Sequence, residues 1–182
     1  MPVSVHIVPI GFEDLFPLPA YANALGEHLH CETAIHKALI DTDIAHDPSR
    51  MQYHSTRLLK QIRDTAPDGE SKVLGITPYD LFLPVLTFLF GQAQVNDRAA
   101  VFSTFRLRNG FYGLPADKNA LFQRALKEGM HELGHTFGLR HCSVEPCAMN
   151  ASTYVEDIDI KPAAYCRECQ ITVNKALTNI SL

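Results

Sequence analysis

Three histidines and a glutamate in the last third of the chain have the spacing of a metal site. His131, Glu132 and His135 form a His-Glu-x-x-His run, and His141 follows six residues later, after Gly138. Residues four apart share one side of a helix, so His131 and His135 can bind one small cation together. Gly138 permits the left-handed backbone that ends a helix, which lets the chain turn back and bring His141 up as a third ligand. Three imidazole nitrogens and one water make the open tetrahedral site typical of catalytic zinc.

Glu132 lies beside these histidines but points in another direction around the helix axis. It can therefore act as a general base toward a zinc-bound water without being a ligand itself. Zinc brings the pKa of its bound water from about 15.7 toward 7, and a neighbouring base can move the proton from that water to a leaving amine. The residues predict a zinc-dependent hydrolase, because a zinc scaffold has no need of a base here.

The cysteines predict a second metal site that starts at the next residue. A Cys-x₄-Cys pair and a Cys-x-x-Cys pair suit a closed tetrahedral zinc site, which would be structural; the four residues are Cys142, Cys147, Cys166 and Cys169. Two disulfides, a redox pair and four unconnected thiols are the alternatives. The expected intracellular setting and the weak apolar pattern of this segment count against them. We therefore expect two zinc ions per chain, and we hypothesise that the cysteine site fixes where the adjacent His141 lies. Cys31 is interpreted as a small buried residue without a role.

Alternating strand-like and helix-like segments precede these motifs. Residues 3–9, 33–40 and 72–77 read as strands, and residues 86–95 and 99–107 read as an antiparallel hairpin with a turn at Asn96-Asp97. A helix is predicted from Asp47-Pro48, with apolar residues from Met51 to Ala66 at helical spacing. Asp117 is the expected cap of a second helix, whose apolar stripe runs from Leu121 to Phe137.

Composition limits the classes of function. The 182 residues are 46% hydrophobic and carry a net charge of −4, which fits one globular domain and argues against binding to nucleic acid. No apolar run approaches the 20 or so residues that a membrane-spanning helix needs. The first residues lack the basic start of a signal peptide, so we expect a cytoplasmic protein, and we expect a monomer.

The extended histidine motif, followed by Met149, resembles that of the metzincin clan of zinc peptidases. The run of cysteines after His141 resembles that of the archaemetzincins, and this resemblance is specific over residues 127–169. It implies an α+β, metzincin-like domain over residues 1–182 whose N-terminal part is α/β-like. Residues 1–138 would hold a twisted mixed sheet and two main helices, and residues 139–182 a small irregular subdomain held by the cysteine zinc. It also implies a catalytic zinc on the three histidines, with Glu132 as the base.

Several roles are open at this level. In metzincins an edge strand pairs with the peptide substrate, and residues 86–95, with Phe88, Phe90, Gln92 and Gln94 on one face, are the matching candidate; an ordinary core strand is the alternative. Met149 is expected beneath the histidines. Tyr154 is left out of the catalytic set because its spacing is unusual.

A zinc-stabilised peptide-binding or regulatory protein is the alternative function. The residues do not decide between an endopeptidase and an aminopeptidase, or whether residues 106–116 form a lid.

Overall fold

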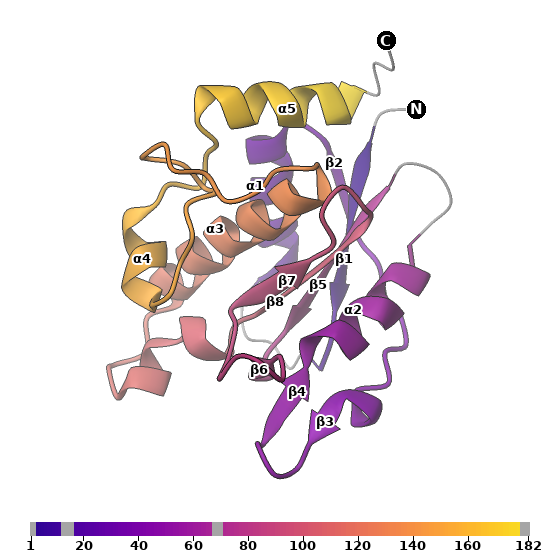
Figure 1. Ribbon diagram of the computed structural model, residues 1–182, viewed down its shortest axis with the longest axis vertical. Coiled ribbons are helices and arrows are strands. Elements are labelled where there is room, and N and C mark those ends of the chain that lie inside the picture. The colour runs from indigo at the N-terminus through magenta and orange to yellow at the C-terminus, as the bar shows by residue number, and fades with distance from the viewer. Residues whose placement is uncertain (1–2, 12–16, 67–70, 179–182) are drawn as a thin grey trace.

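A five-stranded sheet forms the centre of the molecule, as the computed structural model in Figure 1 shows. The structure describes residues 3–11, 17–66 and 71–178. The strands are β1 (Ser4–Pro9), β2 (Glu32–Ile35), β3 (His46–Asp47), β4 (Gln52–His54), β5 (Lys72–Thr77), β6 (Leu81–Phe82), β7 (Gly91–Ala93) and β8 (Ala99–Ser103). The helices are α1 (Leu18–Leu29), α2 (Ser55–Asp64), α3 (Lys118–Thr136), α4 (Val155–Ile160) and α5 (Arg167–Thr178).

The central sheet has the strand order β2-β1-β5-β8-β7. Its first four strands are parallel, and β7 joins the edge antiparallel to β8, so the sheet is mixed as predicted. All five residues of β8 and five of six in β5 are buried, as in strands covered on both faces. A second, small sheet of order β3-β4-β6 lies below it in Figure 1.

Helices cover both faces of the central sheet, and alternate residues of each strand supply the two cores. On one face Leu58 and Ile62 of α2 pack with residues such as Val101 of β8. On the other face α1, α3 and the C-terminal helices pack against the sheet, with Tyr21 and Phe102 fully buried. The α+β class is confirmed. Within the described residues, no helix combines the length and apolar character needed to cross a membrane.

Four predicted elements differ from the structure, and one of them, the strand predicted over residues 33–40, is β2 and already ends at Ile35. The helix predicted from Asp47 begins only at Ser55, because the Asp47 carboxylate accepts hydrogen bonds from the backbone of Ser49 and Arg50 and closes a turn between β3 and β4. Met51, expected in the buried stripe, lies in this turn with a φ of 54° and is 75% exposed.

The strand predicted over residues 86–95 is the shorter β7. Its first part leaves the sheet because the Arg50 guanidinium donates to the carbonyls of Leu86 and Thr87, and Gln52 also donates to the carbonyl of Thr87. The hairpin with β8 is present, with Gly91 opposite Phe102, and Asn96 lies in the turn with a φ of 55°. The strand predicted over residues 99–107 ends at Ser103 and continues as a 3₁₀ turn, Phe105–Leu107.

The C-terminal segment holds more regular structure than the sequence indicated. It contains α4 and the twelve-residue α5, which buries Cys169, Val173 and Leu177. Helix α1 was also not predicted, although Tyr21, Leu25 and Leu29 have the i, i+4, i+8 spacing of a buried helix face.

Candidate metal centre and active site

Helix α3 carries the first two histidines, and its ends match the prediction. The Asp117 carboxylate accepts a hydrogen bond of 2.9 Å from the backbone N–H of Ala120, which caps the helix. At the other end Gly138 has a φ of 94°, and the backbone N–H of Leu139 donates to the carbonyl of Gly134. This turn brings the chain back toward the helix, as the predicted third ligand requires.

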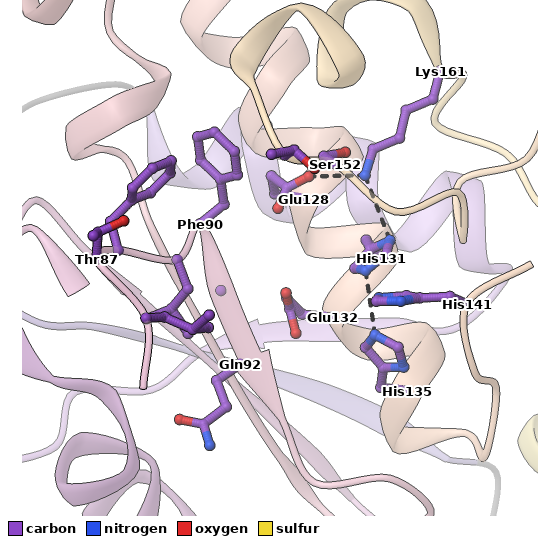
Figure 2. Close-up of a pocket in the computed structure, with 15 residues that line it drawn as sticks. Thr87, Phe90, Gln92, Glu128, His131, Glu132, His135, His141, Ser152 and Lys161 are labelled. Carbon is purple, nitrogen blue, oxygen red and sulfur yellow. Dashed lines mark hydrogen bonds and ion pairs between the residues drawn. The ribbon is translucent and has the colours of Figure 1, made fainter. Parts of the chain in front are cut away.

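The structure brings the three histidines together (Figure 2). One ring nitrogen from each of His131, His135 and His141 lies within 4.8 Å of the others. The Nε2 atoms of His131 and His135 are 3.2 Å apart. Two nitrogens bound to one tetrahedral zinc at about 2.0–2.1 Å would be about 3.3 Å apart. The spacing therefore fits a shared zinc ion.

Hydrogen bonding on the far side of each ring supports the same assignment. Nδ1 of His131 donates to the carbonyl of Ala148 at 2.8 Å, and Nδ1 of His135 donates to the carbonyl of Leu139 at 2.9 Å. Both Nε2 atoms are then unprotonated and face each other with their lone pairs. A cation that binds both lone pairs removes this repulsion. Backbone carbonyls that accept from the other nitrogen of a ligating histidine fix the orientation of its ring.

Burial keeps these two rings neutral. The pKa of His131 is well below its ordinary value, mainly because of burial and also because of the ammonium of Lys161. Burial likewise lowers the pKa of His135. Neutral imidazole is the form that binds zinc, so the two ligands need not lose a proton first.

Glu132 points from α3 toward the strand that carries Gln92 (Figure 2). Its side chain is buried, and burial together with the carboxylate of Glu128 raises the pKa of Glu132 well above the ordinary value, against an opposing effect of Lys161. A raised pKa suits a carboxyl that must both accept and return a proton near neutral pH.

Met149, which was expected beneath the histidines, packs against α3 at Gly134, the residue before His135. It is fully buried, and a Cβ added at Gly134 of α3 would come into steric conflict with the Met149 sulfur. The adjacent residue Ala148 supplies the carbonyl that binds His131. The turn at residues 148–149 therefore packs directly against the metal-binding part of α3.

The histidines and Glu132 open into one cavity of about 420 Å³. Its wall includes Phe88, Phe90 and Gln92, as the sequence indicated, together with residues that it did not. Gln94 is not part of this wall. Because β7 is an edge strand of the central sheet, it can accept an extended peptide along this cavity.

Two charged residues in the cavity wall were missed from the sequence. Lys161 Nζ lies 3.0 Å from Glu128 Oε1 and 3.5 Å from His131 Nδ1 (Figure 2). Glu128 could have been found, because it precedes His131 by three residues on the same helix face. Lys161 follows α4, thirty residues beyond His131, and no local pattern connects it to the site.

The cysteines also form one group. The four Sγ atoms of Cys142, Cys147, Cys166 and Cys169 lie within 4.8 Å of one another. The Sγ atoms of Cys142 and Cys166 are 3.9 Å apart, close to the roughly 3.8 Å expected of two thiolates on one tetrahedral zinc at 2.3 Å. All four are free thiols in the described chain, which argues against the disulfide alternative.

Asn150 closes the loop that holds the first two cysteines. Its Nδ2 donates to the carbonyls of Cys142 and Val144, and its Oδ1 accepts from the backbone N–H of Cys147, each at 2.9 Å. The backbone N–H of Cys142 also donates to the carbonyl of Met149 at 3.0 Å. The cysteine loop and the turn beneath the histidines are thus one connected structure.

Other candidates lie outside the cavity. Tyr154 is 66% exposed at the start of α4 and does not line it. No residue of the segment 106–116 lines it either; Arg124 holds that segment by donating to the carbonyl of Leu107 and to Asn109 Oδ1. Cys31 is half-buried, and burial raises the pKa of its thiol to about 11.

Several known proteins similar to this chain carry the name archaemetzincin. The sequence model of peptidase family M54 matches residues 39–175. The archaemetzincin of Methanocaldococcus jannaschii is 43% identical over 125 residues, which cover 69% of this chain and 68% of that protein. The archaemetzincin of Halobacterium salinarum is 34% identical over 176 residues, with 94% and 99% covered. The crystal structure of the archaemetzincin from Methanopyrus kandleri matches with a TM-score of 0.82 and 31% identity, covering 97% of this chain and 96% of that one.

Proposed function

The chain belongs to peptidase family M54 and is a zinc-dependent metallopeptidase, and we propose that its three clustered histidines hold the catalytic zinc while Glu132 acts as the general base. The observation that carries this assignment is the pair of Nε2 atoms of His131 and His135, 3.2 Å apart, with both Nδ1 atoms committed to backbone carbonyls. His141 is the third member of the group.

In this proposal the bound zinc supplies a Lewis acid that polarises the scissile carbonyl and makes water nucleophilic at neutral pH. Glu132 accepts a proton from the attacking water as the new C–O bond forms. It then donates that proton to the leaving nitrogen as the peptide C–N bond breaks. The free edge of β7 holds the substrate in an extended conformation beside Glu132. Phe88 and Phe90 supply apolar contacts along the same wall.

We further propose that the four cysteines hold a second, structural zinc, so that each chain carries two ions. The inter-sulfur distance of 3.9 Å and the loop closed by Asn150 support this count. A single catalytic domain with subdomains at residues 1–138 and 139–182 is part of the same proposal. The proposal also includes a monomeric state, a cytoplasmic location and the absence of nucleic-acid binding. Size-exclusion chromatography, cell fractionation and a gel-shift assay test these three points in turn.

The Glu132→Gln variant tests the catalytic assignment. We expect it to retain both zinc ions, counted by native mass spectrometry, and to lose turnover of a peptide library that the wild-type protein cleaves. Glu27→Gln, which changes an exposed glutamate on α1, is the matched control and should cleave normally. Turnover by Glu132→Gln would contradict the assignment. Binding of peptides without cleavage by the zinc-loaded wild type would favour the peptide-binding alternative.

A further inference from the structure

We infer that Gly91 is a positioning residue for the proposed general base: the missing side chain at this position of β7 lets the Glu132 carboxylate lie against the strand and reach the reacting water. The inference rests on the proposed role of Glu132. It concerns a residue on the opposite side of the cavity, far from the histidine motif in the sequence.

The fit between the two residues is close. A Cβ built on Gly91 would lie 2.7 Å from both Cγ and Cδ of Glu132, and its nearest neighbour would be Oε1 of the same carboxylate. Carbon atoms in favourable contact are about 3.5–4.0 Å apart. The three nearest atoms all belong to Glu132, so the space that a side chain would occupy at this position is filled by the base.

Packing against β7 holds the carboxylate in this direction. Over residues 3–11, 17–66 and 71–178, no protein group donates a hydrogen bond to the Glu132 carboxylate. The side chain is 4% exposed. Because no protein donor in these ranges fixes the carboxylate, its position depends on the surface it rests on, and Gly91 forms part of that surface.

The strand cannot easily move away from an added side chain. Gly91 is paired with the fully buried Phe102 of β8, and the carbonyl of the preceding residue, Phe90, accepts a hydrogen bond of 2.8 Å from the backbone of Ser103. The next residue, Gln92, is held by a hydrogen bond of 2.6 Å from the Ser55 hydroxyl. A larger residue at position 91 must therefore displace Glu132 rather than the strand.

The first experiment measures catalysis by Gly91→Ala. A displacement of about 1 Å from the productive geometry can lower a rate on the order of 100-fold. We expect kcat to fall by about this factor while KM and the zinc content stay at wild-type values, and we expect a crystal structure of the variant to show a displaced Glu132 carboxylate. Gly110→Ala, where an added Cβ meets nothing within 4 Å, is the control and should retain wild-type kcat. A wild-type kcat for Gly91→Ala would overturn the inference.

A stability cycle tests the contact without any substrate. With Glu132 present, Gly91→Ala should lower Tm by about 2–4 °C or more, because the added methyl overpacks the site. In a Glu132→Ala background the same change should leave Tm unchanged or raise it, since alanine is better than glycine within a strand. Equal effects in the two backgrounds, or failure of the double variant to fold, would overturn the inference. Retained turnover by Glu132→Gln would instead overturn the proposed function and leave this contact standing.

Discussion

Lys161 and Glu128 form a buried ion pair in the wall of the active-site cavity, with Nζ 3.0 Å from Oε1 and side chains 2% and 3% exposed. Glu128 lies on α3, three residues before His131, and Lys161 directly follows α4. The pair therefore joins the C-terminal segment to the helix that carries the metal ligands. Removing one partner would leave the other as an uncompensated charge away from water.

We predict that Lys161→Met lowers the free energy of unfolding of the zinc-loaded protein by about 3–5 kcal/mol, the usual cost of breaking a buried pair. The double variant Glu128→Met/Lys161→Met should recover most of this loss, because apolar side chains of similar size can replace such a pair. Urea unfolding followed by circular dichroism measures both. The more exposed pair Arg63–Asp97, with 3.5 Å between Nη2 and Oδ2, is the control, and Arg63→Met should cost about 0–1 kcal/mol. A loss for Lys161→Met no larger than this would contradict the prediction.

The sequence predicted correctly those elements whose formation depends on a few neighbouring residues. The six residues of β5 and the Asp117 cap of α3 agree with the prediction, because a buried β run and a capping side chain act over a few residues. The predicted start of α2 was wrong because a carboxylate such as that of Asp47 can cap a turn as well as a helix. Which of the two it caps is decided by the pairing of β4 with β6, which joins residues far apart in the chain.

The same division holds for the site. His131, His135 and Glu132 are placed by helical periodicity, so their spacing was sufficient. Gly91 and Lys161 reach the cavity through sheet pairing and through the path of the chain after α4, and no spacing rule connects them to the histidines. This part of the cavity wall, in contrast to the metal ligands, could be described only from the structure.

Gly134→Ala should destabilise the protein, although the same change in an open helix usually stabilises it by about 1 kcal/mol. The added Cβ would come into conflict with the sulfur of Met149 and would lie 3.2 Å from Cε1 of Tyr165, both of which are buried. We expect a loss of about 1–3 kcal/mol from overpacking, measured by urea unfolding. Gly110→Ala serves as the control. An increase in stability for Gly134→Ala would show that Met149 does not support α3 from below.

Asn150→Ala should lower the stability of the cysteine loop, whether or not the loop holds a metal ion. The carboxamide satisfies the carbonyls of Cys142 and Val144 and the backbone N–H of Cys147, so its removal costs about 2 kcal/mol. We expect a lower urea midpoint and faster zinc release to a chelator. Asn174→Ala, which removes one exposed hydrogen bond with Gln170, should change neither. Unchanged zinc release from Asn150→Ala would mean that the loop is held by its metal alone.

Cys142→Ser should weaken zinc binding at the histidines as well as at the cysteines. Among the described residues, His131 and His135 each have a carbonyl behind the ring, whereas no hydrogen bond holds the exposed His141, which makes only ring contacts. Its position therefore depends on the backbone, which passes directly into Cys142 and its bond to the carbonyl of Met149.

Loss of outer support commonly lowers the affinity of a metal site 10–100-fold, and we expect a decrease in this range for the histidine site of Cys142→Ser. Chelator competition measures it, with His131→Ala identifying which phase of zinc release belongs to the histidines. Cys31→Ser, which changes a thiol outside both groups, is the matched control and should release zinc as the wild type does. A histidine site of wild-type affinity in Cys142→Ser would show that the turn at Gly138 positions His141 without help from the cysteines.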